Sequence, residues 1–211
     1  MILRNFIVFE GIDGTGTTTQ IEELKSRYEN ISKGMDVPVF FTCEPTSGEI
    51  GKCIRRALRG EVQFTPETMA RLFAADRGEH LFGDGGIKAQ LDSGKAVFSD
   101  RYIFSSLAYQ GETLNSALPM QLNQDFPLPE YLFFFDIDSH LSMNRVEKRA
   151  GTLEIYEKRE FQQKVRSRYM DVIDHFEKTE PDMHVIRIDA SRDVVTIAEN
   201  IWSIARNLPK I

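Results

Sequence analysis

Short apolar segments alternate along the chain with longer stretches whose apolar residues recur at the spacing of a helix. Five of the short segments have the length and composition of strands, at residues 5–10, 37–42, 96–100, 131–136 and 184–189. Several are almost continuously apolar, as strands covered on both faces of a sheet should be. The alternation predicts an α/β fold of three layers, in which a five-stranded parallel sheet is flanked by helices.

Two of the expected helices carry one apolar face each. In the helix after the first strand, this face comprises Ile21, Leu24, Tyr28 and Ile31. In the last helix it comprises Val194, Ile197, Ala198, Ile201, Ala205 and Leu208. We expect these residues to pack on the sheet, and 211 residues with 41% hydrophobic content suffice for one core. Residues 1–211 are predicted to form a single domain, with the charged segment 145–168 as a candidate for a mobile surface element.

The composition narrows the classes of partner. The net charge is −6, so the chain lacks the broad positive field that draws proteins onto nucleic acid, and any phosphate must be held locally. Cys43 and Cys53 are the only cysteines and form no C-x-x-C pair, which argues against a disulfide framework and a zinc site. Because the sequence shows neither a secretory leader nor an apolar run of membrane-spanning length, we expect a cytoplasmic protein that binds neither nucleic acid nor membranes.

A glycine-rich stretch joins the first strand to the first helix. Gly11, Gly16 and Thr18 occupy fixed positions of the phosphate loop G-x-x-x-x-G-K-[ST], but Thr17 stands where that pattern has lysine. A loop between a buried strand and a helix directs backbone N–H groups and the positive helix end at an anion. The alternative is a glycine-rich turn that binds nothing. The predicted ATP-binding residues of this stretch are Gly11, Gly14, Thr15, Gly16, Thr17, Thr18 and Thr19.

Residues 9–20 resemble the opening of thymidylate kinases, with the pattern Phe-Glu-Gly-Ile-Asp-Gly-x-Gly-x-x-Thr-Gln. Four further segments agree in order and spacing, at residues 44–46, 72–77, 99–111 and 189–191, so the resemblance covers nearly the whole chain. It implies a P-loop kinase fold that transfers a phosphoryl group from ATP to thymidylate (dTMP). It also implies Mg²⁺ as cofactor and a homodimer.

The resemblance assigns the base and sugar of the acceptor to particular residues. It implies that Phe73 stacks on thymine, that Arg77 reaches a base oxygen, and that Ser105 or Ser106 lies near the opposite edge. Phe73 and Arg77 are four residues apart, so a helix would place them on one side. The alternative is a core phenylalanine and a solvated arginine. Tyr109 would lie beneath the sugar and exclude a 2′-hydroxyl, unless it only packs beside its neighbours.

Residues after the second strand are candidates for the acceptor phosphate. Glu44 and Pro45 resemble the family's Glu-Pro turn and are assigned to the substrate site. Cys43 precedes them where many bacterial members have arginine, so we expect the phosphate contact to shift to the following helix. The cations available there are Lys52, Arg55 and Arg56, and we assign the contact to Arg55.

Phosphoryl transfer requires positioning and positive charge around the moving group. Asp100 ends the third strand and could hold Mg²⁺, while Thr18 supplies a hydroxyl ligand. Arg101 suits a bidentate grip on the acceptor phosphate. Structural salt bridges are the alternative for both Asp100 and Arg101. By resemblance, Asp13 holds the 3′-hydroxyl of the acceptor, and Ser191 lies in the loop that approaches adenine.

A charged segment at about 145–160 occupies the position of the family's lid, which closes over ATP. One branch of the family has an arginine inside the phosphate loop, and another has a glycine there with the catalytic arginine on the lid. Gly14 therefore points to Arg149, which joins Asp13 and Arg101 as the predicted catalytic residues. Because of Thr17, a nucleotide-binding protein that has lost its chemistry remains an alternative. A kinase for another nucleoside monophosphate, such as deoxyuridylate or a purine monophosphate, is a further alternative.

Overall fold

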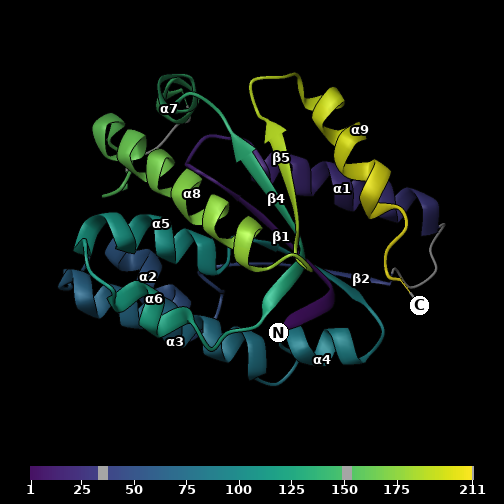
Figure 1. Cartoon of the computed structure of the whole chain (residues 1–211), viewed down its shortest axis with the longest axis horizontal. Coiled ribbons are helices and arrows are strands. Elements are labelled where there is room, and N and C mark those ends of the chain that lie inside the picture. The colour runs from purple at the N-terminus through teal and green to yellow at the C-terminus, as the bar shows by residue number, and fades with distance from the viewer. Residues whose placement is uncertain (33–37, 149–153, 211) are drawn as a thin grey trace.

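The computed structural model describes residues 1–32, 38–148 and 154–210 (Figure 1). Its strands form one sheet in the order β2-β3-β1-β4-β5, and every neighbouring pair is parallel. The strands are β1 Ile2–Gly11, β2 Val39–Cys43, β3 Ala96–Asp100, β4 Leu128–Asp136 and β5 His184–Asp189. The predicted α/β fold with a five-stranded parallel sheet is confirmed.

Two strands begin earlier than the apolar pattern indicated. β1 starts at Ile2, and β4 starts at Leu128. Asn5 adopts φ 59, and the register between β1 and β4 shifts after Leu3. A polar residue with a left-handed backbone and a proline inside β4 are turn signals in a sequence, and here a shift in pairing accommodates them. Residue 37, the expected start of the second strand, lies outside the described residues.

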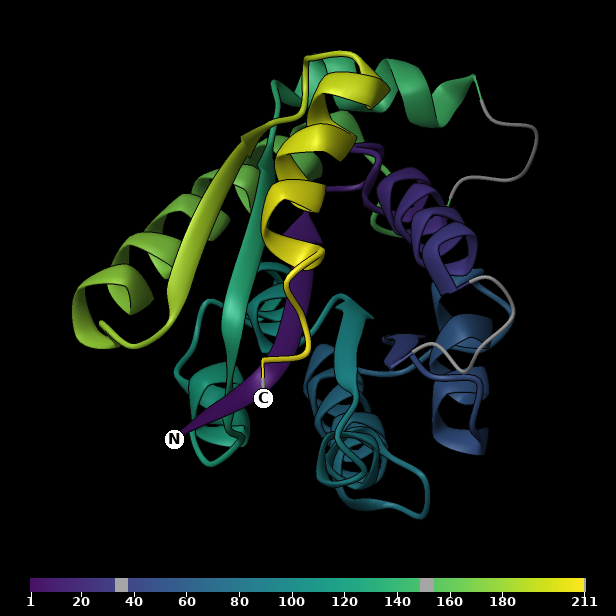
Figure 2. The same ribbon diagram turned by 90° about the vertical axis from the view of Figure 1, so that its right-hand side faces the viewer.

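Helices cover both faces of the sheet. α1 and α9 pack together on one face, and α5 and α8 pack together on the other (Figures 1 and 2). The helices of the described residues are α1 Thr17–Ser32, α2 Glu49–Leu58, α3 Pro66–Phe82, α4 Ile87–Asp92, α5 Ile103–Leu114, α6 Leu118–Asn123, α7 Ser139–Glu147, α8 Arg159–Thr179 and α9 Val194–Ala205. None of these described helices combines the length and apolar character needed to cross a bilayer.

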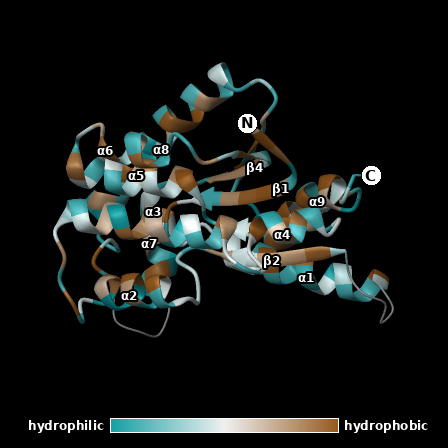
Figure 3. Cartoon of the chain, turned by 90° about the horizontal axis from the view of Figure 1, so that it is seen from below, coloured by the Kyte–Doolittle hydropathy of each residue, from teal (hydrophilic) through white to brown (hydrophobic). Residues whose placement is uncertain are grey.

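The core is built around β1 and β4. Residues 6–9 are fully buried, and the rings of Phe9 and Phe133 stack with centroids 5.2 Å apart. In Figure 3, hydrophobic colour dominates strands such as β2, whereas the outer helices mix both colours. One cluster of buried residues runs from β1 to the segment after α9. The prediction of a single domain over residues 1–211 stays a prediction.

The predicted helix faces are buried except at their ends. Ile31 is 57% exposed and Val194 is 48% exposed, so the prediction was wrong for these two residues. Both lie in terminal turns, where a helix has neighbours on fewer sides. Leu208 is buried, but it lies beyond α9, which ends at Ala205.

Candidate active site

A cavity of about 480 Å³ opens at the carboxyl ends of β2 and β3, beside the phosphate loop. This edge of a parallel sheet is where ligands of such folds bind. The cavity brings together most of the residues that the sequence assigned to the acceptor and the metal. They are Asp13, Thr18, Glu44, Pro45, Arg55, Phe73, Asp100, Arg101, Ser105 and Tyr109.

The phosphate loop is shaped by close approach of its neighbours. Gly14 and Gly16 adopt φ 83 and φ 95, a backbone region that side chains disfavour. A Cβ on Gly14 would lie 2.4 Å from the Ser142 carbonyl oxygen of α7, and one on Gly11 would lie 2.8 Å from the Phe135 carbonyl oxygen of β4. Position 14 therefore has no room for a side chain, and any arginine near the phosphates must come from another element.

Asp100 and Thr18 provide a candidate metal site. Thr18 Oγ1 donates to Asp100 Oδ2 at 3.0 Å. Asp100 Oδ1 is buried and has no hydrogen-bond partner among the described residues. A buried carboxylate oxygen without a partner, beside a hydroxyl, fits the oxygen ligands that Mg²⁺ prefers. Residues 1–32, 38–148 and 154–210 contain no group of three or more His, Cys, Asp or Glu side chains suited to a metal, so a cation here would need ligands from water and nucleotide.

Arg101 pairs with Asp13, not with its neighbour in sequence. Arg101 Nη2 lies 2.5 Å from Asp13 Oδ1, and Nη1 donates to the Gly11 carbonyl oxygen at 3.1 Å. The guanidinium also lies 5.3 Å from the centre of the Tyr109 ring, within the range of a cation–π contact. Burial raises the pKa of Tyr109, so its phenol stays neutral. Arg101 itself has φ 72, a strained backbone of the kind that gathers at functional sites.

Gln162 on α8 is a site residue that the sequence did not reveal. It is fully buried, and its Nε2 donates to Asp13 Oδ2 at 2.6 Å and to the Tyr156 carbonyl oxygen at 3.0 Å. Its Oε1 accepts from the Asp13 N–H at 3.2 Å. The surrounding segment, 145–168, was expected to be a mobile surface element, but residues 159–168 form the first half of α8 and reach into the site. The many charged residues of this segment indicated an exposed surface, although Gln162, Val165 and Tyr169 lie on one buried face of the helix.

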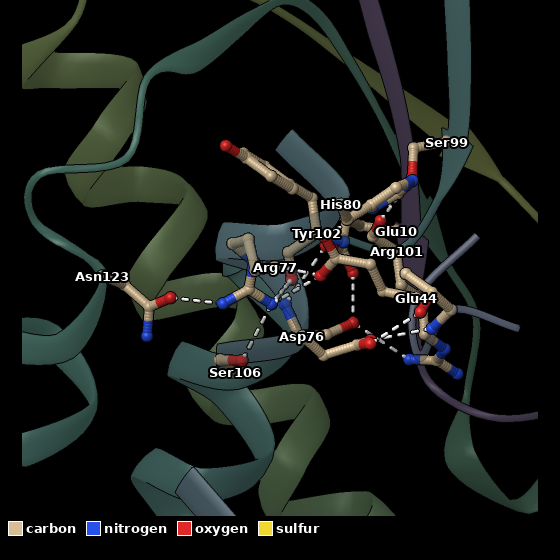
Figure 4. A network of polar contacts seen from close by, with 12 residues as sticks. Glu10, Glu44, Asp76, Arg77, His80, Ser99, Arg101, Tyr102, Ser106 and Asn123 are labelled. Atoms are coloured by element: carbon tan, nitrogen blue, oxygen red, sulfur yellow. Dashed lines mark hydrogen bonds and ion pairs between the residues drawn. The ribbon is translucent and has the colours of Figure 1, made fainter. Parts of the chain in front are cut away.

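Arg77 and Ser106 lie behind the cavity wall. Arg77 is 1% exposed, and its Nη2 donates to Glu44 Oε2 at 2.7 Å and to Ser106 Oγ at 3.0 Å. It also contacts Asn123, as Figure 4 shows. Of the predicted base-binding residues, Phe73 lines the cavity, whereas Arg77 and Ser106 do not. The alternative of a solvated Arg77 is wrong, and its contact with a base stays a prediction.

Gln110 is a second residue for which the motifs predicted no role, although it lies in the segment 99–111 that resembles the family. It lines the cavity next to Tyr109 and is 2% exposed. Its Oε1 is buried without a hydrogen-bond partner among the described residues. A buried amide oxygen without a hydrogen-bond partner is costly, and a ligand bound in the cavity that Gln110 lines would offset this cost.

Arg55 is the cation of α2 that faces the cavity. Its Nη2 contacts the Pro45 carbonyl oxygen and lies 3.6 Å from Cys43 Sγ. Lys52 and Arg56 are more than half exposed and do not line the cavity; they pair with the surface carboxylates of Glu49 and Glu61, respectively. Of the three candidates for the acceptor-phosphate contact, Arg55 is therefore the best placed.

Arg145 of α7 joins the phosphate loop to the loop after β5. Its Nη1 lies 3.4 Å from the Thr15 carbonyl oxygen, and its Nη2 donates to the Ala190 carbonyl oxygen at 3.1 Å. Ser191 follows there, with its hydroxyl donating to Asp189. Arg149, the predicted catalytic cation, lies outside the described residues. Thr17 is half-buried at the start of α1, and Thr19 is exposed.

Comparisons with known proteins show which family the chain resembles. The family model described as thymidylate kinase matches residues 9–201. The chain is 44% identical to a protein of Treponema pallidum (strain Nichols) over 200 residues, which cover 95% of this chain and 94% of that protein. It is 39% identical to a protein of Thermococcus kodakarensis over 96% of this chain and 98% of that one. A protein of Methanocaldococcus jannaschii is 34% identical over 99% of this chain and all of its own length.

All three relatives carry provisional thymidylate kinase names. The family model spans the phosphate loop, the cavity and the helices that enclose them. The resemblance inferred from the motifs is therefore confirmed, and the chain belongs to the thymidylate kinase family.

Proposed function

We propose that this protein transfers the γ-phosphoryl group of ATP to dTMP, giving dTDP and ADP. One observation carries the proposal: the phosphate loop and the cavity lined by Phe73 and Tyr109 meet at the Arg101–Asp13 pair. ATP on the loop and an acceptor in the cavity would bring their phosphates to the same cation. Positioning of this kind is most of what phosphoryl transfer needs.

The residues around the moving phosphoryl group have complementary roles. Arg101 stays charged at physiological pH and would grip the acceptor phosphate with its planar fork. Asp13 would accept a hydrogen bond from the 3′-hydroxyl of the acceptor. Asp100 and Thr18 would hold Mg²⁺, which when bound neutralises charge on the phosphate oxygens. Gly11, Gly14, Thr15, Gly16, Thr17, Thr18, Thr19 and Ser191 are proposed for ATP.

Recognition of the base combines an apolar ring with one amide. Phe73 supplies a face for stacking on the base. Gln110 offers both a donor and an acceptor, which suits the polar edge of a pyrimidine, and a base would satisfy its unpartnered oxygen. Arg77 is buried against Glu44 and Ser106, so it would have to reach a base oxygen from behind the cavity wall. Tyr109, beneath the sugar, would disfavour ribose.

A homodimer is proposed on the family resemblance alone, and a cytoplasmic setting stays a prediction. The absence of the loop lysine at Thr17 supports a second candidate function, a nucleotide-binding protein without kinase activity. Removing one charged partner from a transition state commonly costs about 3 kcal/mol, roughly a hundredfold in rate. Arg145, which already contacts the loop, argues for retained catalysis.

A panel of acceptors tests the function and its alternatives. The test measures ADP release from ATP with dTMP, dUMP, the ribose counterpart of dTMP, AMP and dGMP, each with and without Mg²⁺. We expect dTMP to be preferred and the ribose form to react much more slowly. Asp100→Ala serves as the inactive control. Preference for a purine would assign another acceptor, and binding of nucleotides without any ADP release would establish a protein that binds but does not catalyse.

A further inference from the structure

Glu10 is a fully buried carboxylate directly before the phosphate loop. Its Oε1 accepts the backbone N–H groups of Tyr102 at 2.8 Å and Ser105 at 3.1 Å. These residues open α5, whose N-cap residue Tyr102 makes no side-chain cap of its own. A carboxylate from β1 thus caps α5 from a distance, and the positive helix end favours its ionised form.

The other oxygen of Glu10 reaches toward Arg101 through two hydroxyl groups. Oε2 lies 2.6 Å from Ser105 Oγ and 2.8 Å from the Tyr169 hydroxyl. Arg101 Nη1 lies 3.2 Å from Ser105 Oγ and 3.4 Å from the Tyr169 hydroxyl. Each hydroxyl can donate to Glu10 and accept from Arg101 at the same time, because its oxygen carries one proton and two lone pairs. Glu10 and Arg101 belong to the network of polar contacts in Figure 4.

Arg101 is therefore held from two sides. Its Nη2 is paired with Asp13 of the phosphate loop, while its Nη1 faces the hydroxyls that Glu10 orients. If Glu10 becomes neutral, the attraction of Asp13 is no longer balanced, and the hydroxyl protons are no longer held toward Glu10. The guanidinium would then move toward Asp13 and away from α5.

We propose that Glu10 is a positioning residue for Arg101: its ionised carboxylate, acting through Ser105 and Tyr169, keeps the guanidinium where it meets the acceptor phosphate. This rests on the proposed function, in which Arg101 binds that phosphate. Glu10 does not line the cavity itself. The other charged or titratable groups facing this cluster, among the described residues, are Asp13 of the phosphate loop, Asp100 of β3, Tyr109 of α5 and Glu154, which precedes α8.

The ionisation of Glu10 falls in an accessible pH range. Burial raises the pKa of Glu10 from its ordinary value of 4.5 to about 7, against the lowering effect of Arg101 and of its hydrogen-bond donors. The competent anion predominates above this pH. Turnover that depends on the anion should therefore rise as the pH increases through about 7.

Glu10→Gln provides the test, because glutamine has nearly the same shape and is neutral at every pH. We would measure dTDP formation directly by chromatography from about pH 5.5 to 8.5, a range that brackets the acceptor phosphate's own ionisation near pH 6. We expect kcat/KM of the unaltered protein to rise around pH 7, and the variant to lack this rise and to be roughly tenfold slower at pH 8. The ionisation of the substrate affects both proteins equally.

Tyr169→Phe removes one linking hydroxyl from a residue that does not line the cavity. It should give a smaller loss and move the rise to higher pH, because the carboxylate loses a donor that lowers its pKa. It also keeps the test decisive if Glu10→Gln fails to fold. Tyr131→Phe, at the far end of β4, is the matched control and should leave the profile unchanged.

Two results would overturn the positioning role. One is a Glu10→Gln profile with the same rise as the unaltered protein, whatever its absolute rate, since a purely structural cap would act at every pH. The other is a Tyr169→Phe profile with neither loss nor shift. Failure of the unaltered protein to form dTDP at any pH would instead overturn the proposed function.

Discussion

At the scale of single residues, the main question is which charge replaces the loop lysine at Thr17. Among the described cations, Arg101 and Arg145 donate to carbonyl oxygens of the phosphate loop. Arg101 directly follows β3, whereas Arg145 lies on α7. Arg101 is already engaged with Asp13 on the acceptor side. Arg145 comes from α7, which leads into the segment containing Arg149. It is therefore the described residue best placed to approach the phosphates of ATP.

We expect Arg145→Ala to lower turnover on the order of a hundredfold, because it would remove a positive charge near the transferred group. Thr17→Lys should gain little in the unaltered protein, yet recover part of the loss in the Arg145→Ala background. Single-turnover dTDP formation at saturating ATP and dTMP measures both effects. Arg149→Ala, tested in parallel, measures how much the predicted lid cation contributes to turnover.

Binding measurements separate this role from a contact with adenine. Arg145 also reaches the Ala190 carbonyl oxygen beside Ser191, so its removal is expected to weaken ATP binding as well. A strong gain from Thr17→Lys alone, with full turnover in both arginine variants, would contradict compensation. It would identify the protein as a weakened kinase.

At the scale of elements, α7 and α8 hold the phosphate loop from outside the sheet. α7 fills the space above Gly14, and α8 fixes Asp13 through Gln162. Glu147 at the end of α7 pairs with Arg159 at the start of α8, with Nη2 and Oε2 2.6 Å apart. α7 and α8 are thus connected by this ion pair, and both also contact the phosphate loop.

Gln162→Leu tests the link between α8 and the phosphate loop. Leucine fills similar space but leaves one oxygen of Asp13 and the Tyr156 carbonyl oxygen without their donor. We expect turnover to fall roughly tenfold and the free energy of unfolding to fall by about 1–3 kcal/mol. The measurements are kcat with dTMP and chemical denaturation.

Gln163 provides the matched control, because it is the next residue of α8 and is exposed. Gln163→Leu should leave both quantities nearly unchanged. If Gln162→Leu and Gln163→Leu behave alike, Asp13 does not depend on α8 for its orientation.

At the scale of the whole molecule, the segment after α9 is attached to the starts of β1 and β4. The Asn5 N–H donates to Glu130 Oε2 at 2.7 Å, and Lys210 Nζ lies 2.7 Å from Glu130 Oε1. Asn5 and Lys210 also exchange two hydrogen bonds, at 2.8 and 3.1 Å. These contacts lie at the end of the sheet opposite the cavity. Substitutions there are therefore expected to change stability without changing catalysis.

Glu130→Gln should lower stability by about 1 kcal/mol or less near pH 7, because Lys210 is half exposed and its attraction is screened. Burial raises the pKa of Glu130, but the hydrogen bonds from Lys210 and Asn5 outweigh it and lower the pKa overall. The unfolded chain therefore protonates first, and the stabilising charge is lost as the pH falls through the lowered pKa. The difference in Tm between variant and unaltered protein should shrink below about pH 4.

Activity at neutral pH should not change, since Glu130 is remote from the cavity. Glu49→Gln is the control, because its partner Lys52 lies on an open surface. A Tm difference for Glu130→Gln that is constant with pH would show that its charge contributes nothing.

The sequence by itself determined the strands and the place of the phosphate loop between the first strand and the first helix. These features depend on local chemistry: apolar runs at residues 6–9 and 132–135 must be covered on both faces, and glycines permit the turn at Gly14 and Gly16. The family motifs are also local in sequence. Together with the phosphate-loop pattern, the strand ends and the cations of the second helix, they predicted ten residues that line one cavity, from Asp13 to Tyr109.

Only the tertiary structure decided how those residues are held. Gln162 lies 149 positions from Asp13, and Glu10 lies 95 positions from Ser105, so no spacing rule connects them. Arg77 looked like a free recognition residue, yet packing placed Glu44 and Ser106 around its guanidinium. Burial, hydrogen-bond completion and the pKa of Glu10 depend on which helices cover a side chain. That depends on the packing of elements distant in sequence, which local patterns do not contain.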